Sequence, residues 1–226
     1  MKSIYEFLLK SKTAVSTQVN GCVDLDLPSG LLWARCNIGA DEPYEYGDYF
    51  MWGSTEPDTN DLCIWAHAPF NNGSSSHDIA YFNSVKDKVC PNDILAHKHD
   101  AANIIMGDEW RLPTDDDFQE LIDNTKHEWI KNYQGSSING MLFTPKNAEA
   151  AKANGDELDT ELFIPASGYR SGSGFNNRGS SVDLWSSSLD TIRPYYARNL
   201  YFSDSNCSMY YNSRCLGFCL RGVKEN

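Results

Sequence analysis

The 226-residue sequence predicts an α+β fold, with two helices beside small twisted antiparallel sheets. Apolar residues recur with helical spacing in two stretches, 94–106 and 114–122. Apolar and acidic residues alternate at 22–27, which is the pattern of a half-buried strand. The last third of the chain lacks helical spacing and shows short apolar islands among serine, asparagine and glycine, as strands separated by turns do. Both kinds of element are therefore expected, with strands prevailing towards the C-terminus.

The first twenty residues are expected to form a helical extension, 1–20, ahead of a domain that spans 21–226. Ile4, Phe7 and Leu8 fall on one helical face. This face is expected to pack on the domain or on a partner subunit, so a homo-oligomer is an open alternative. A charged residue on either side of Phe7 interrupts the apolar run that a signal peptide requires, and we expect no secretion signal.

Strands and then a long loop are expected next. A Pro-Ser-Gly turn at 28–30 separates the strand at 22–27 from a second strand at 31–34. The stretch 44–52 is rich in aromatic residues and glycine, which indicates strands with loops. Residues 54–90 contain prolines and a Gly-Ser tract, and they are expected to form an irregular surface insertion.

The helix at 114–122 has the clearest local signal. Thr114 is a preferred N-cap residue, and Asp117 three positions later completes a capping-box pattern. The acidic first turn, 115–117, suits the positive end of the helix dipole. We interpret these aspartates as a solvated helix terminus rather than a metal site. The helix before it, at 94–106, is expected to end at a glycine.

Short strands are expected after the second helix. Residues 129–143 indicate a hairpin that turns at Asn139 and Gly140. Residues 145–160 indicate an excursion with a short helix, and 162–165 a buried strand. The apolar islands of the last third lie at 184–185, 195–196, 200–202 and 216–220.

Charge and composition exclude two classes of partner. The net charge of −12 argues against a general nucleic-acid binder. No run of about 18 apolar residues exists that could insert into a membrane. The charge is unevenly divided: residues 1–165 hold 12 basic and 27 acidic residues, a net of −15, and residues 166–226 hold 7 and 4, a net of +3. The fifty residues 171–220 contain no lysine, glutamate or glutamine, although 1–170 contain 23 of these.

No catalytic, metal or cofactor site is expected. Seven cysteines without a secretion signal do not indicate a disulfide framework. Only Cys215 and Cys219 are closely spaced, and the second pair that zinc requires is missing. A thiolate nucleophile needs a neighbouring base or cation. Arg214 is adjacent to Cys215, but no histidine follows His127 and no G-x-S-x-G motif occurs. We therefore do not expect an enzyme.

Six motifs follow one another along the chain. They read VDLDLPSGLLWA at 23–34, YGDYFMWG at 46–53, WRLPT at 110–114, FIPASGYR at 163–170, LWSSS at 184–188 and GFCLR at 217–221. This series resembles the Fibrobacter succinogenes major paralogous domain over residues 22–223. The resemblance implies a C-type-lectin-like fold, which is related to the fold of the formylglycine-generating enzyme.

Within that fold class, the chain resembles the variable proteins of diversity-generating retroelements. In these systems a reverse transcriptase copies a template repeat and mutates its adenines, so that AAC codons for asparagine become NNC codons. Such codons cannot encode lysine, glutamate, glutamine, methionine or tryptophan. The resemblance thus accounts for the composition of 171–220 and implies a diversified region at 171–221, in which Trp185 and Met209 are fixed by the template.

The resemblance implies ligand recognition through the C-terminal surface. The C-terminal region has the composition of an antibody paratope, since it combines tyrosine, serine, asparagine and glycine with arginines that include Arg214. Adjacent strand residues face opposite sides, so at least one tyrosine of each adjacent pair is expected to be exposed. Trp185, Phe202 and Phe218 are instead expected in the core. The residues expected on the variable surface are Phe175, Arg178, Val182, Asp183, Leu184, Ile192, Arg193, Tyr195, Tyr196, Arg198, Tyr201, Asp204, Cys207, Ser208, Tyr210, Tyr211, Ser213, Cys215 and Leu216.

The ligand implied by the resemblance is a protein or glycan on a cell surface. Because no signal peptide is recognised, a phage virion or tail component, or a cytoplasmic product, is favoured over display on a cell. Two alternatives stay open. One is an undiversified adhesive or structural domain of the same family, and the other is an oxidase of the formylglycine-generating type that uses Cys215 and Cys219.

Overall fold

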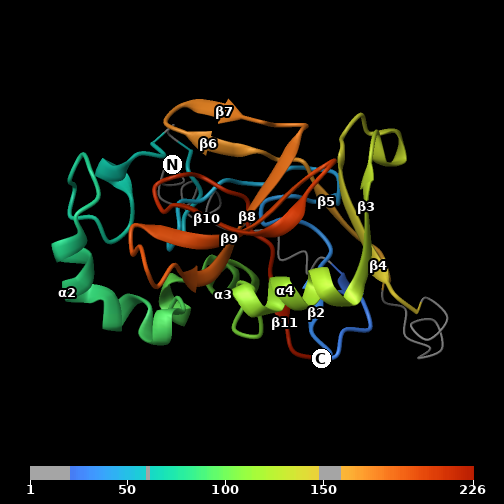
Figure 1. The fold of residues 1–226 in the computed structure, drawn as a ribbon, viewed down its shortest axis with the longest axis horizontal. Coiled ribbons are helices and arrows are strands. Elements are labelled where there is room, and N and C mark those ends of the chain that lie inside the picture. Colours follow the sequence, from blue (N-terminus) through green and yellow to red (C-terminus); the bar gives the residue numbers. More distant parts are fainter. Residues whose placement is uncertain (1–20, 60–61, 148–158) are drawn as a thin grey trace, which may run out of the picture.

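The computed structural model describes residues 21–59, 62–147 and 159–226. These residues form a mixed α+β structure, in which helices lie around several small antiparallel sheets (Figure 1). The helical extension expected at 1–20 and most of the excursion expected at 145–160 lie outside the described residues. Within the described part, every helix is too short or too polar to cross a membrane.

Three α-helices occur in the described residues, where two were expected. They are α2 (Ile79–Val89), α3 (Ala101–Met106) and α4 (Asp115–Asn124), and the 3-10 turns are η1 (Trp65–His67), η2 (Pro91–Asp93), η3 (His97–His99) and η4 (Tyr133–Gly135). Helix α2 lies in the segment expected to be irregular. Asp78 caps it by accepting the N–H of Tyr81 at 2.9 Å, and its buried Phe82 anchors it to the core.

The helix expected at 94–106 is shorter in the structure. Ile94 forms a β-bridge with Ser188, so the backbone is extended there. The helix begins only after Asp100, whose carboxylate accepts the N–H of Ala102 at 2.9 Å.

Helix α4 begins where the sequence predicts. Thr114 Oγ1 accepts the N–H of Asp117 at 3.1 Å, and Asp117 Oδ2 accepts the N–H of Thr114 at 2.7 Å, so the capping box is confirmed. The expectation of a merely solvated acidic turn is wrong for two of the three aspartates. Arg111 pairs with Asp117 at 2.6 Å, and Arg198 pairs with Asp115 at 3.0 Å.

The strands of the described residues form four small sheets. They are β1 (Cys22–Asp24), β2 (Leu32–Ala34) and β11 (Val223–Lys224); β3 (Thr125–Ile130), β4 (Gly140–Pro145) and β5 (Leu162–Pro165); β6 (Tyr169–Ser171) and β7 (Gly174–Asn176); and β8 (Ser181–Leu189), β9 (Tyr196–Ser203) and β10 (Cys207–Ser213). The strand pairs within these sheets are antiparallel. The last sheet has the order β10-β9-β8, so β10 is an edge strand.

Several strand predictions are confirmed and others need correction. Residues 162–165 are buried throughout, and the alternation at 22–27 buries Val23, Leu25 and Leu27. The hairpin of β3 and β4 does not turn at Asn139 and Gly140, because Gly140 already pairs with Ile130 and the reversal is made by 131–139. Strands were expected at 44–52, but the β-pairing of this stretch is limited to an isolated bridge between Phe50 and Phe218.

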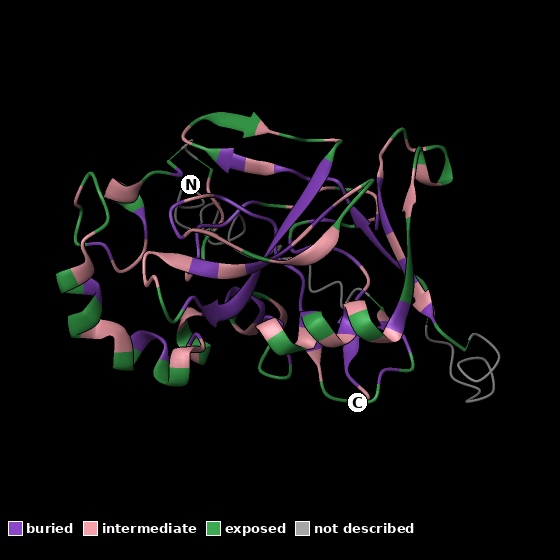
Figure 2. Cartoon of the chain, viewed as in Figure 1, coloured by how far each residue is buried: buried purple, intermediate pink, exposed green. Residues whose placement is uncertain are grey.

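The core consists of two main clusters. One gathers Trp33, Phe118 and Phe143 with Leu184 and Phe202, and the other gathers Phe50, Trp52, Phe82, Trp185 and Phe218. Strand β8 contributes to both clusters and is buried along its whole length (Figure 2). Helix α4 packs against β8, β9 and β10 (Figure 1). The three aromatic residues expected in the core of the C-terminal third are therefore confirmed there, since Trp185, Phe202 and Phe218 are fully buried.

Candidate ligand-binding site

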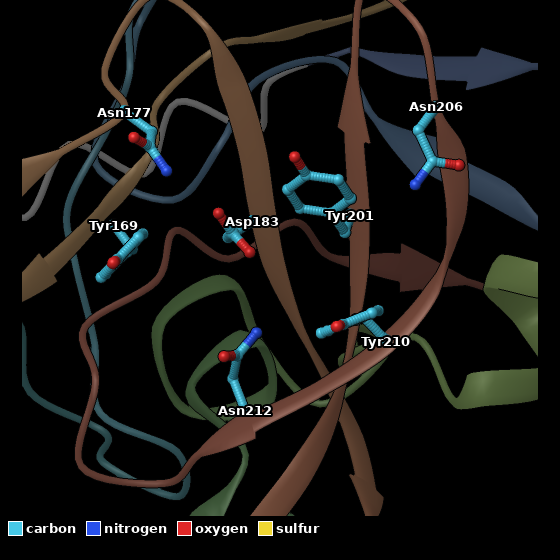
Figure 3. Close-up of a pocket in the computed structure, with 7 residues that line it drawn as sticks. All are labelled: Tyr169, Asn177, Asp183, Tyr201, Asn206, Tyr210 and Asn212. Carbon is cyan, nitrogen blue, oxygen red and sulfur yellow. The ribbon is translucent and has the colours of Figure 1, made fainter.

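A pocket of about 370 Å³ opens on the β8–β9–β10 sheet, next to the β6–β7 hairpin (Figure 3). Its lining is polar and aromatic, and consists of Tyr169, Asn177, Asp183, Tyr201, Asn206, Tyr210 and Asn212. Strand register explains why these residues meet. Asp183 pairs with Tyr201, and Asn199 pairs with Tyr210. Residues directly opposite one another share a face of the sheet, as do alternate residues along a strand.

Asp183 lies among the lining residues near the middle of the pocket (Figure 3). It is only 3% exposed, and Asn199 Nδ2 donates to its Oδ1 at 3.2 Å. Asn212 Nδ2 donates in turn to Asn199 Oδ1 at 3.2 Å, so a chain of side-chain hydrogen bonds crosses all three strands. Burial raises the pKa of Asp183 to about 7. The pocket therefore contains a carboxyl group that ionises near neutral pH.

A run of tyrosine rings follows the edge of the same sheet. Tyr195 contacts Tyr196 with ring centroids 4.4 Å apart, and Tyr196 stacks on Tyr211 at 5.4 Å. Tyr211 stacks on Tyr210 at 5.3 Å, and Tyr210 contacts Tyr201 at 6.0 Å. Five tyrosines thus form one continuous aromatic surface, which we call the tyrosine run. It reaches into the pocket through its last two members.

The expectation that at least one tyrosine of each adjacent pair is exposed holds for Tyr210 and Tyr211, but Tyr195 and Tyr196 are both half-buried. None of the five members of the tyrosine run is buried, and Tyr210 is 50% exposed. The adjacent tyrosines were expected to be separated by the alternation of the strand. In the structure the rings of Tyr210 and Tyr211 stay in contact, because β10 has no strand beyond it and both side chains can bend around the open edge.

Arg193 covers one end of the tyrosine run. Its guanidinium lies 3.6 Å from the ring centre of Tyr211 and 5.3 Å from that of Tyr196. Asp190 holds it, with an ion pair at 3.3 Å, and the same aspartate accepts the N–H of Arg193 at 2.7 Å. A fixed cation is therefore part of this surface.

A second aromatic group lies on the β6–β7 hairpin and the loop after it. Phe175 is 47% exposed, and the guanidinium of Arg178 lies 3.6 Å from its ring centre. Arg178 also donates from Nε to the hydroxyl of Tyr49 at 3.1 Å and lies over the ring of Tyr46 at 4.8 Å. These contacts fix the orientation of an exposed arginine on the β6–β7 side of the molecule.

The structure divides the sequence-predicted residues into three groups. Exposed positions are Phe175, Arg178, Ile192, Asp204 and Tyr210. Half-buried positions are Arg193, Tyr195, Tyr196, Arg198, Tyr201, Cys207, Ser208, Tyr211, Ser213 and Leu216. Buried positions are Val182, Asp183, Leu184 and Cys215.

The buried group corrects the sequence prediction. Val182 and Leu184 lie on the core face of β8 and belong to the first core cluster. Cys215 packs with Met51 and Cys63. These three side chains are not available to a ligand. Asp183 is also buried, but it lies on the opposite face of β8 and lines the pocket.

Two of the arginines assigned to the surface have structural contacts. Arg198 forms the ion pair with Asp115 of α4. Arg214 is fully buried, and its guanidinium lies 4.0 Å from the ring centre of Phe82. It also donates to the backbone carbonyl of Pro194 at 2.9 Å. The expectation that Arg214 contributes to a recognition surface is wrong.

Sequence reasoning missed several residues of the pocket. Tyr169 lies just before the region expected to be variable, 171–221. Asn177, Asn206 and Asn212 lie within that region, but they were not among the residues expected on the variable surface. The three asparagines could have been predicted from the sequence, because asparagine is encoded by AAC, the codon that is mutated in the systems that the chain resembles. Tyr169 had no such signal, because only the fold brings β6 to the pocket, where Gly168 forms a β-bridge with Val182 of β8.

The cysteines that an oxidase would require are in unfavourable surroundings for thiolate chemistry. All seven cysteines are free thiols. Burial raises the pKa of Cys215 to about 11 and that of Cys219 to about 12, so both thiols stay protonated at neutral pH. Cys219 was expected to be half-buried, but it is fully buried and belongs to a different core cluster from Cys215. Among the described residues, no group of histidine, cysteine, aspartate or glutamate side chains is arranged to hold a metal ion.

Comparison of the chain with protein-family models, with curated proteins and with solved structures yields no match.

Proposed function

We propose that this protein recognises a protein or glycan on a cell surface through its C-terminal surface, and that a retroelement diversifies that surface. The proposed scaffold is a C-type-lectin-like domain of the Fibrobacter succinogenes paralogous type. The observation that supports recognition most strongly is the tyrosine run. Tyrosines are large, rigid and amphipathic, so they provide contact area at a low cost in conformational entropy. The five tyrosines of the run contact one another in succession, and none of them is buried.

The contrast between this surface and the scaffold below it supports diversification. No residue of β10 is buried, and Tyr210 is its exposed member, whereas β8 is buried along its whole length and β9 is half-buried at alternating positions. Exposed side chains can change with little effect on the core. A region with a constant interior and a replaceable exterior is what repeated mutagenesis requires. The absence of lysine, glutamate and glutamine from 171–220 fits NNC codons at the replaceable positions.

Neither alternative is supported by a feature as specific as the tyrosine run. An undiversified adhesive domain leaves the missing residue types of 171–220 unexplained. An oxidase requires a reactive thiolate, and the burial of Cys215 and Cys219 favours the protonated thiols instead. We therefore place the function in binding rather than in catalysis.

Cell binding by the full chain tests this proposal. Fluorescently labelled protein is applied to a panel of bacterial strains, and the strain that retains it is used to compare variants. The double variant Tyr210→Ser/Tyr211→Ser removes two adjacent rings of the tyrosine run. Tyr81→Ser, at an exposed position of α2, is the matched control.

We expect the double variant to lose at least tenfold in affinity and the control to keep the affinity of the unaltered protein. Equal binding by all three proteins contradicts a role for the tyrosine run.

A further inference from the structure

We propose that the pocket around Asp183 receives the cationic end of a basic side chain, the ammonium of a lysine or the guanidinium of an arginine, presented by a protein ligand. This inference rests on the proposed function, because it names the group by which the recognised partner is anchored. It commits to a protein rather than a glycan.

The first argument is that the carboxyl group of Asp183 lacks a cation. The ion pairs of the described residues do not include Asp183, and neither lysine nor arginine lines the pocket. Asn199 and Ser181, the side-chain hydrogen-bond partners of Asp183, are both neutral. Removing a carboxylate from water without a countercharge is costly, and an incoming cation offsets that cost.

The second argument concerns the walls of the pocket. Tyr169, Tyr201 and Tyr210 place three aromatic side chains around Asp183 (Figure 3). Aromatic faces attract ammonium and guanidinium groups, and they also cover the aliphatic part of a lysine or arginine side chain. The volume of about 370 Å³ lies near the lower end of the range for small-molecule pockets, which suits one side chain.

The amide of Asn212 offers an acceptor to a donor-rich ligand. Asn212 uses its Nδ2 to donate to Asn199, so its Oδ1 remains as an acceptor. Asn177 and Asn206 also line the pocket. An ammonium has three donors and a guanidinium five, and neither has an acceptor. A neutral sugar leaves the charge of Asp183 uncompensated, and an anionic group is repelled by it.

The charge of the pocket near neutral pH depends on one group. The other titratable side chains that line the pocket with Asp183 are Tyr169 from β6, Tyr201 from β9 and Tyr210 from β10. Burial raises the pKa of Asp183 to about 7, so it is mostly ionised at pH 8 and mostly protonated at pH 6. Affinity for a cation is therefore expected to fall as the pH is lowered from 8 to 6.

The test uses the full chain and two matched probes, Nα-acetyl-lysine methylamide and Nα-acetyl-norleucine methylamide. The probes share a linear side chain and differ in the ammonium. Binding is measured by isothermal titration calorimetry, and the side-chain amide signals of Asn199 and Asn212 are followed by NMR. Asp183→Asn keeps the shape of the site and an acceptor for Asn199. Asp204→Asn removes the same charge from the exposed turn between β9 and β10 and is the control.

We expect the lysine probe to bind at pH 8 at least tenfold more tightly than the norleucine probe. Asp183→Asn and a change to pH 6 are each expected to remove most of this preference, and Asp204→Asn to leave it intact. Equal binding of the two probes overturns the proposal, as does a preference that survives Asp183→Asn. Tighter binding of neutral methyl glycosides than of the lysine probe also overturns it, in favour of a sugar site.

The controls separate this inference from the proposed function. If Asp183→Asn fails to fold, the comparison of the two probes at pH 8 and pH 6 still decides the matter on the unaltered protein. Loss of cell binding in the tyrosine double variant without any preference for the lysine probe leaves the proposed function standing and refutes only the cation pocket. A preference for the lysine probe together with intact cell binding by the tyrosine double variant supports the cation pocket and contradicts the role of the tyrosine run in the proposed function.

Discussion

Asn199 donates a side-chain hydrogen bond to Oδ1 of Asp183 at 3.2 Å, across the β8–β9 pair. Both side chains are buried, and Asn212 on β10 continues the chain of bonds to the edge of the sheet. Asp183, at the buried end of this chain, lies in a strand that belongs to the core, and Asn212, at the other end, lines the pocket. The hydrogen bonds from Asn199 and Asn212 therefore hold the carboxyl group of Asp183 in place.

Replacing Asn199 tests this support. Asn199→Leu removes a donor from Asp183 and an acceptor from Asn212, and an orphaned buried polar group costs about 1–3 kcal/mol. We expect the free energy of unfolding in urea at pH 8 to fall by this amount. Asn206→Leu changes an exposed asparagine of the same pocket and is the control. A loss no larger than that of the control means that the bond to Asp183 is not stabilising.

Replacing Asp183 itself predicts an unusual pH profile. The carboxyl group ionises near pH 3.8 in the unfolded chain and near pH 7 in the folded protein, so the folded state holds the proton more tightly. Its contribution to stability is present in full below pH 3.8 and is lost as the pH rises to about 7. Relative to Asp183→Asn, the unaltered protein is expected to lose about 4 kcal/mol over that interval.

Urea unfolding of both proteins at several pH values measures this difference. Asp204→Asn, which lies on an exposed turn, is expected to follow the unaltered protein at each pH. Parallel profiles for the unaltered protein and Asp183→Asn show that Asp183 ionises normally and remove the basis of the pH argument.

The capping box of α4 predicts a local loss of stability. Thr114→Ala removes the hydroxyl that accepts the N–H of Asp117, and the loss of an N-cap costs about 1 kcal/mol. Thr114→Ser keeps the hydroxyl and is expected to retain most of the stability. Thermal unfolding measures both. Equal destabilisation by the two changes assigns the effect to the methyl group of Thr114 rather than to the cap.

The separation of surface from scaffold predicts opposite behaviour for two aromatic sites. Tyr210→Ser/Tyr211→Ser removes side chains from an edge strand, and we expect it to cost about 1 kcal/mol or less. Phe202→Ala removes a fully buried ring and is expected to cost about 3–5 kcal/mol. Urea unfolding compares them. A similar cost for both shows that the tyrosine run is part of the core and speaks against a replaceable surface.

How much the sequence reveals depends on the range of the interactions involved. The capping box of α4 is local, and Thr114 and Asp117 were enough to place it. Helix α2 was missed because glycine, serine and proline residues dominate the segment around it, although its Phe82 has the periodic partner Val89. The start of α3 could not be read, since Ile94 is held extended by a bridge to Ser188, far along the chain.

The site shows the same limit more sharply. Tyrosines 195, 196, 210 and 211 were recognisable because their residue type is common on binding surfaces. Val182, Leu184 and Cys215 were wrongly assigned to the surface, because composition does not show which face of a strand is covered. The pocket depends on register: Asp183 meets Tyr201 and Tyr210 only because β8, β9 and β10 are paired as they are.

The proposed diversification is tested most directly by sequencing the DNA around codons 171–221. We expect a nearby near-copy that differs from these codons only where the copy has adenines, together with a gene for a reverse transcriptase. The differences are expected at exposed and half-buried positions such as Tyr195, Tyr210 and Tyr211, and not at Leu184 or Cys215. The absence of such a copy, with codons at the tyrosine positions that do not end in C, contradicts the account.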